Sequence, residues 1–189
     1  MKKSNSLKSN ASACCWILLG VPVLSIIGCL MHFAYEWSGN LTIVGVFAPI
    51  NESIWEHLKM TFWPMLIWWI VGYFIINKRE SISADQWFVS CAVSQLVCPL
   101  AIISFYYTYT GALGIESLIL DIFSLFLGVA AGQLLALHVF QYAKSSRFCL
   151  YFAIVVLALM AAAFTVFTFA TPYIPLFKDS LTGTYGIWN

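Results

Sequence analysis

Two histidines and three glutamates lie close together in the chain, on either side of a short segment rich in glycine. They are His32, Glu36, Glu52, Glu56 and His57. Imidazole and carboxylate groups are the ligands that zinc, iron and manganese take in proteins. A divalent ion held by them would polarise a carbonyl or phosphoryl group, or lower the pKa of a bound water. We therefore predict that these five residues are the candidate ligands of a zinc, iron or manganese ion.

Three acidic or basic side chains are also candidates for the chemistry itself. Glu56 and the adjacent His57 could act as an acid/base pair even without a metal. Asp121 lies in an otherwise apolar segment, where an unpaired carboxylate would be costly. It could orient a histidine or add a ligand. Glu56, His57 and Asp121 are therefore the candidate catalytic residues.

The same residues also have a purely structural interpretation. Asn51 is a good helix N-cap, and Glu52 would then face the positive end of the helix dipole. Glu56 and Lys59 are three residues apart and could form an ion pair. His32 is as well explained by a structural role as by metal binding, and His138 is expected to be structural.

The chain around these residues has the composition of a membrane protein. It is 61% hydrophobic and 9% charged, whereas a soluble domain is about 25% charged. A formal net charge of +1 leaves no basic surface for nucleic acid. A spanning helix needs about 20 apolar residues, and no alternating strands of a membrane barrel are present. Five segments qualify as spans: 13–35, 54–76, 86–107, 115–142 and 148–170. The predicted fold is an all-α, polytopic membrane helix bundle.

Side chains four residues apart share one face of a helix. His32 and Glu36 should therefore share a face where the first span ends, and Glu52 and Glu56 should share a face where the second span begins. The first two spans are antiparallel neighbours joined by a short loop. Their connected ends should therefore lie close together. This arrangement would bring the five candidate ligands within reach of one ion.

The charges predict the orientation of the bundle. If the spans alternate, basic residues gather on one side: Lys2, Lys3, Lys8, Lys78, Arg79, Lys144 and Arg147. Only Lys59 and Lys178 fall on the other side, together with most of the acids. The positive-inside rule then places the N-terminus and the tail 1–12 in the cytoplasm, and the C-terminus outside.

Three other features leave alternatives open. Gly128 and Gly132 form a close-packing face, used either within the bundle or in a homodimer. The tail 171–189 is too apolar for disorder. It is expected to be ordered, either as a lid that brings Asp179 and Tyr185 near the acidic cluster or as a strip on the lipid headgroups. The six cysteines are expected to pack as small apolar residues.

The segment Asn51-Glu52-Ser53-Ile54-Trp55-Glu56-His57-Leu58-Lys59 resembles the hallmark of a family of small prokaryotic multipass membrane proteins of unknown function. The segments Tyr107–Gly111, Asp121-Ile122 and Thr182–Gly186 are also similar to that family. The resemblance covers nearly the whole chain and implies a location in the prokaryotic cytoplasmic membrane. It implies no activity.

Three classes of function remain open at this point. A metal-assisted membrane enzyme would act on lipids or lipid-linked substrates, because these reach the depth of the candidate residues. A small-solute or ion transporter would need polar groups at mid-membrane leading towards His138. The few available are Ser25, Ser94, Gln95, Ser124 and Gln133. A structural or regulatory subunit would present the acidic end to another protein. The enzyme is favoured because the polar path is sparse.

Overall fold

A computed structural model describes residues 10–187, which are helical apart from short connections and the C-terminal tail. Within this range, five helices are long and apolar enough to cross a membrane. They are α2 (Ala11–Met31), α5 (Ile54–Glu80), α6 (Ala84–Leu113), α7 (Leu118–Tyr142) and α8 (Arg147–Phe169). The predicted helical bundle with five candidate spans is therefore confirmed. Lys2, Lys3, Lys8 and the last two residues of the chain lie outside the described residues.

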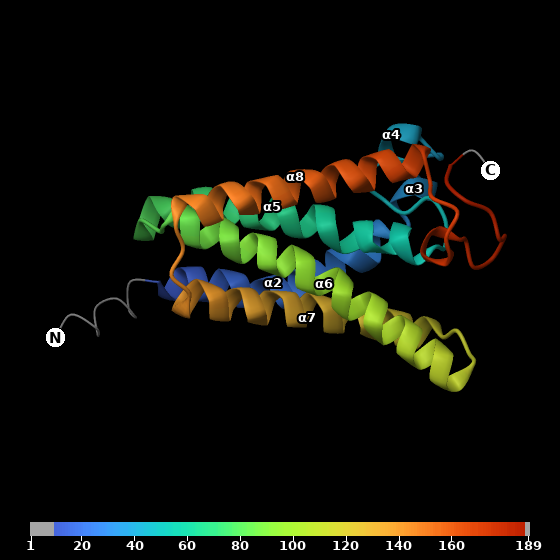
Figure 1. Cartoon of the computed structure of the whole chain (residues 1–189), viewed down its shortest axis with the longest axis horizontal. Helices are drawn as coiled ribbons and strands as arrows, with labels where there is room; N and C mark the ends of the chain where they lie inside the picture. Colours follow the sequence, from blue (N-terminus) through green and yellow to red (C-terminus); the bar gives the residue numbers. More distant parts are fainter. Residues whose placement is uncertain (1–9, 188–189) are drawn as a thin grey trace.

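The helices pack around α5 and α6, which lie at the centre of the bundle (Figure 1). Helix α6 contacts α5, α7 and α8, and α2 contacts α5 and α7. Indole and amide groups fasten these helices together at mid-bundle. Trp69 Nε1 donates to Gln133 Oε1 at 3.1 Å, and Trp87 Nε1 donates to the carbonyl of Trp69 at 2.8 Å. In hydrocarbon such bonds matter because water cannot replace them.

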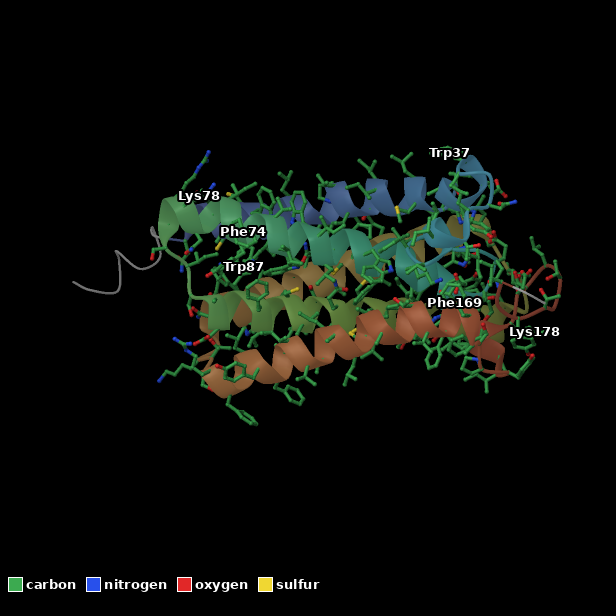
Figure 2. The ribbon with its side chains drawn as sticks, turned by 90° about the horizontal axis from the view of Figure 1, so that it is seen from above. Trp37, Phe74, Lys78, Trp87, Phe169 and Lys178 are labelled. Atoms are coloured by element: carbon green, nitrogen blue, oxygen red, sulfur yellow. The ribbon has the colours of Figure 1, made fainter. Side chains whose placement is uncertain are left out.

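Two ends of the bundle are distinct. Trp37, Phe169 and Lys178 lie at one end, and Lys78 lies at the other (Figure 2). We call the first the loop end: it holds residues 32–53, 114–117 and 171–187. It includes the short helices α3 (Ala34–Trp37), α4 (Thr42–Gly45) and the 3-10 turn η1 (Pro175–Phe177).

The C-terminal tail packs on the loop end through aromatic rings. Phe177 lies 4.7 Å from Trp55 and 5.4 Å from Phe167, measured between ring centroids. Asp179 is buried, and its carboxylate accepts a 3.1 Å hydrogen bond from the amide of Leu181 within the same turn. The tail thus covers the ends of α5 and α8. The Asp179 carboxylate is hydrogen-bonded within its own turn.

The Gly128 and Gly132 face of α7 is used inside the chain. A Cβ at Gly132 would meet the carbonyl oxygen of Ser94 at 2.8 Å, and one at Gly128 would meet Ile102 at 2.5 Å. Both glycines therefore let α7 approach α6 closely. The predicted homodimer through these two residues is not supported, because the face is already covered by α6.

This close approach predicts the effect of adding one methyl group. Gly132→Ala should destabilise the protein by about 1–3 kcal/mol, the usual cost of overpacking, because the obstructing atom belongs to the backbone. Gly111→Ala is the matched control, since nothing lies within 4 Å of its Cβ position. The measurement is thermal unfolding of both variants in detergent. Equal melting temperatures would contradict the close approach of α6 and α7.

Candidate functional site

His32 lies where α2 ends. The α-helix stops at Met31, and a tighter turn with a Phe33 N–H to Leu30 carbonyl bond of 3.2 Å follows. Glu36 belongs to the separate helix α3 and is exposed. The prediction that His32 and Glu36 share one continuous helix face is therefore wrong, because the helix is interrupted between them.

Glu52 and His57 are positioned by the start of α5. Ser53 is the N-cap, and its hydroxyl accepts the backbone N–H of Glu56 at 3.3 Å. Asn51 instead accepts the N–H of Ser53 at 3.0 Å. The expectation that Asn51 is the N-cap is therefore wrong: the cap is Ser53, two residues later, and Glu52 lies in the loop before the helix. The expectation that Glu52 and Glu56 share a helix face is wrong for the same reason.

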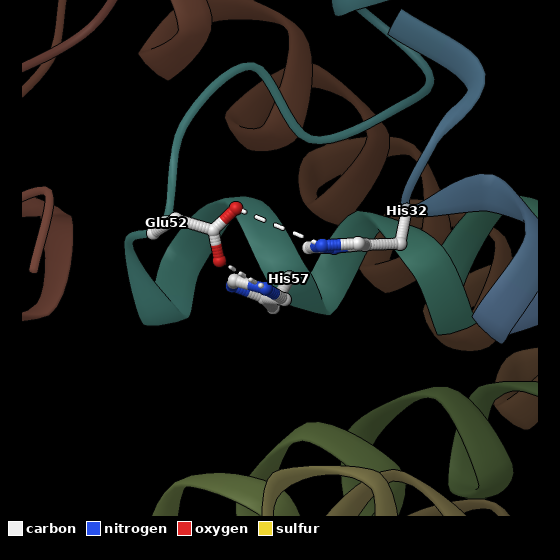
Figure 3. Close-up of side chains that lie close together, drawn as sticks. All are labelled: His32, Glu52 and His57. Atoms are coloured by element: carbon white, nitrogen blue, oxygen red, sulfur yellow. Dashed lines mark ion pairs between the residues drawn. The ribbon is translucent and has the colours of Figure 1, made fainter. Parts of the chain in front are cut away.

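Three side chains converge at the loop end: His32, Glu52 and His57 (Figure 3). The carboxylate of Glu52 lies to one side of the two imidazoles and contacts both (Figure 3). Its Oε1 is 3.7 Å from His32 Nε2, and its Oε2 is 3.3 Å from His57 Nε2. The two rings lie 5.3 Å apart in a near-parallel arrangement. One possible ligand atom from each of the three residues lies within 4.8 Å of the others.

The backbone determines which nitrogen of His57 faces Glu52. His57 Nδ1 lies 2.8 Å from the carbonyl oxygen of Ser53. A carbonyl only accepts hydrogen bonds, so Nδ1 carries the hydrogen. In the neutral imidazole, Nε2 then has a free lone pair, and this lone pair points at the carboxylate of Glu52. Two acceptors 3.3 Å apart need a proton or a cation between them.

Electrostatics keeps the carboxylate ionised. The side-chain hydrogen bond with His57 holds the pKa of Glu52 below its ordinary value of 4.5, against the opposing effect of burial. The coulombic effects of His57 and His32 act in the same direction as the interaction. Glu52 is consequently a negative charge at neutral pH, which suits a cation.

The three side chains are a ligand set that a small divalent cation takes with one open position. Zinc binds histidine nitrogen at 2.0–2.1 Å and carboxylate oxygen at about the same distance, which places tetrahedral ligands about 3.4 Å apart. The 3.7 and 3.3 Å separations involve different oxygens of Glu52, and one ligand atom from each residue lies within 4.8 Å of the others, so a bound ion would draw the three side chains slightly closer. Two histidines and one glutamate form a catalytic ligand set that leaves the fourth position for water or substrate. The three side chains are 28–38% exposed, so that position is accessible.

Glu56 lies outside this trio, in a buried ion pair with Lys59. The Nζ atom of Lys59 lies 2.6 Å from Glu56 Oε2, as the spacing allowed. It also donates to the carbonyl of Gly45 at 2.8 Å and to Thr168 Oγ1 at 2.6 Å. The same Glu56 oxygen accepts the N–H of Ile50 at 3.2 Å. All three ammonium donors are used, and the network joins α5, α8 and the loop that carries Glu52.

Asp121 is on α7, at the same end of the bundle, and is paired with a tyrosine. Tyr109 of α6 donates its hydroxyl to Asp121 Oδ1 at 2.5 Å. The structure therefore brings together His32, Glu52 and His57, with Asp121 at the same end of the bundle. It does not bring Glu36 or Glu56 into the trio.

The helix start that shapes the site has a signal in the sequence. Ser53-Ile54-Trp55-Glu56 has the S-x-x-E pattern of a capping box, which predicts a helix starting at Ser53. That start places Glu52 before the helix. It also places His57 one turn inside, where its ring can reach the carbonyl of the cap. No sequence signal pairs Tyr109 with Asp121, because the two residues lie on different helices.

A family model described as "Family of unknown function (DUF6512)" matches residues 5–187 of the chain. Comparison with curated proteins and with solved structures gives no match.

Proposed function

The chain belongs to this family of unknown function, and we propose, from the geometry of the site, that it is a membrane enzyme assisted by one divalent metal ion. The proposed ligands are His32, Glu52 and His57. The proposed reaction is attack by water on a carbonyl or phosphoryl group of a lipid or lipid-linked substrate. Zinc, iron and manganese all accept this ligand set.

One observation carries the proposal: His57 Nε2, the ring nitrogen that does not face the Ser53 carbonyl, lies 3.3 Å from a carboxylate oxygen of Glu52. The Ser53 carbonyl fixes this orientation through Nδ1. Metal-binding histidines are typically held in this way, with the second ring nitrogen donating to a carbonyl or carboxylate. A protonated histidine would satisfy the same contact. The metal content of the protein therefore decides between a metal site and a simple ion pair.

The remaining polar groups have assignable roles in such a reaction. A metal ion would supply a water of lowered pKa and would polarise the bond to be broken. Asp121 would hold or deliver a proton, with Tyr109 fixing its position. Glu56 would act indirectly, because its ion pair with Lys59 anchors the loop that presents Glu52.

The site lies at an end of the bundle, where the polar parts of lipids meet the hydrocarbon. We infer from the distribution of lysine and arginine that this end is extracytoplasmic, with the N-terminus in the cytoplasm. The resemblance to prokaryotic proteins favours the cytoplasmic membrane of a prokaryote. Substrates would then be lipids of the outer leaflet or intermediates attached to them.

The polar residues at mid-membrane support an enzyme more than a transporter. Ser94 donates to the carbonyl of Cys91, and Gln95 donates to that of Phe62. Ser25 and Ser124 likewise donate to carbonyls of their own helices. Gln133 accepts from Trp69. The three serines are therefore bonded within their own helices, and Gln95 and Gln133 join neighbouring helices, as expected for a rigid scaffold.

The proposal is tested by metal analysis of the protein purified in detergent without chelators. Mass spectrometry should find about one zinc, iron or manganese ion per chain in the wild type, and His57→Ala should abolish it. His138→Ala is the matched control, because His138 is exposed near the other end of α7 and packs only on Tyr142 among the contacts described. Equal metal content in all three proteins, or none in the wild type, would overturn the metal site.

A further inference from the structure

An apolar groove lies between α2 and α7, which run side by side along one edge of the bundle (Figure 1). It has a volume of about 270 Å³. Its walls are formed by Ile26, Cys29 and Leu30 of α2, and by Ile122, Leu125 and Phe126 of α7. Ser25 also lines it, but the Ser25 hydroxyl is bonded to the carbonyl of Val21. The groove consequently offers almost no polar contact to an occupant.

Both walls of the groove lead to residues of the candidate site. Leu30 precedes His32 by two residues, which is about 3 Å along a helix axis. Ile122 follows Asp121, which lies in the first turn of α7, at the loop end. The groove therefore begins just below the trio of His32, Glu52 and His57 and runs away from it into the apolar part of the bundle.

The groove faces the hydrocarbon of the membrane. Ile26 and Leu30 on one wall are 62% and 53% exposed, and these side chains belong to helices that qualify as membrane spans. In a bilayer such surface is covered by acyl chains. A polar substrate would gain nothing from the lining, whereas a chain of methylene groups fits it.

We propose that this groove holds one acyl chain of a membrane lipid and presents the first carbonyl group of that lipid to the site. This inference rests on the proposed function and narrows its substrate to acylated lipids. Lipid tails are as apolar as the groove, so hydrophobic transfer contributes little to binding. The groove acts by orientation: it fixes the depth and direction of a chain whose polar end lies at the level of His32.

Photo-crosslinking tests the groove separately from the metal. The protein is reconstituted into vesicles of phosphatidylethanolamine and phosphatidylglycerol that contain a small fraction of phosphatidylcholine with a diazirine in its acyl chain. After irradiation, the labelled residues are mapped by mass spectrometry. We expect labelling to concentrate on the groove residues of α2 and α7, above the level on the lipid-facing surface of α8.

Filling the groove should remove this enrichment. Cys29→Trp places a large side chain in it, and Cys15→Trp is the matched control, because Cys15 is exposed on the same helix outside the groove. Labelling of the α7 wall should fall to the level of α8 in Cys29→Trp and stay unchanged in Cys15→Trp. The wild-type map is informative even if Cys29→Trp does not fold.

Three outcomes would overturn the groove as an acyl site. They are even labelling of all lipid-facing helices, unchanged labelling in Cys29→Trp, and a protein–protein crosslink through α2 and α7. Metal content is measured on the same wild-type sample. Metal without enriched labelling would leave the proposed function standing and reject the groove. Enriched labelling without metal would support the groove as an acyl site and reject the proposed metal-assisted function.

Discussion

Replacing Lys59 by methionine is expected to destabilise the protein by about 3–5 kcal/mol, the usual cost of removing one partner of a buried ion pair. Lys59 is 0% exposed and Glu56 is 3% exposed. The substitution leaves the Glu56 carboxylate buried without its countercharge. It also removes the donors to Gly45 and Thr168. The measurement is reversible unfolding in detergent or mixed micelles.

Two further variants make this prediction specific. Lys178→Met, at an exposed lysine of the same end, should change the free energy of unfolding by less than about 0.5 kcal/mol. The double variant Glu56→Met with Lys59→Met should recover most of the loss, because apolar side chains of similar volume can replace a buried pair. A loss below about 1 kcal/mol in Lys59→Met would contradict the buried network.

Glu52→Gln is expected to weaken metal binding by more than about a hundredfold, the upper range for removal of an outer partner of a ligand. Glu52 is the one carboxylate of the trio and contacts both imidazoles. Glutamine keeps the shape of the side chain but removes the negative charge. Zinc affinity, measured by competition with a chromogenic chelator, checks the effect. Glu36→Gln should bind zinc as the wild type does, since Glu36 is exposed on α3.

In the absence of metal, the difference in stability between the wild type and Glu52→Gln is expected to depend on pH. The folded-state pKa of Glu52 is lowered, so its charge stabilises the fold above the ordinary value of 4.5. That contribution is lost as the pH falls through the lowered pKa. The melting temperatures of wild type and Glu52→Gln should therefore differ at pH 6 and converge at acidic pH, below the lowered pKa of Glu52. A difference independent of pH would show that the charge of Glu52 has no role.

Hydropathy was sufficient to find the five helices but could not assign their faces. Residues that pack on another helix and residues that contact lipid are equally apolar. Gly128 and Gly132 illustrate this limit, because their spacing is the same whether the partner is α6 or a second copy. Asp121 illustrates it as well, since its partner Tyr109 lies on a neighbouring helix. Such pairs depend on the rotation of each helix, which hydropathy does not encode.

The sequence predicted a site of histidines and carboxylates, but only three of the five predicted ligands lie together in the structure. The regular spacing of Glu52 and Glu56 would place both on one face only if both lay in a helix. The cap at Ser53 divides them: Glu52 is in the loop, and Glu56 is in the first turn of α5. For His32 and Glu36, the end of α2 at Met31 has the same effect. Helix ends, which depend on local hydrogen bonds, therefore decided which acids reach the histidines.

The buried network of Lys59 also has a consequence for how the chain is made. Membrane helices enter the bilayer in the order of synthesis, and α5 arrives while α8 is still untranslated. Glu56 and Lys59 are three residues apart, so they neutralise each other and let α5 insert at low cost. Thr168 is 109 residues away from Lys59 and joins only with the last helix. The hydrogen bond that links α8 to the Lys59–Glu56 pair, and through it to the loop that presents Glu52, therefore forms only after the last helix has been made.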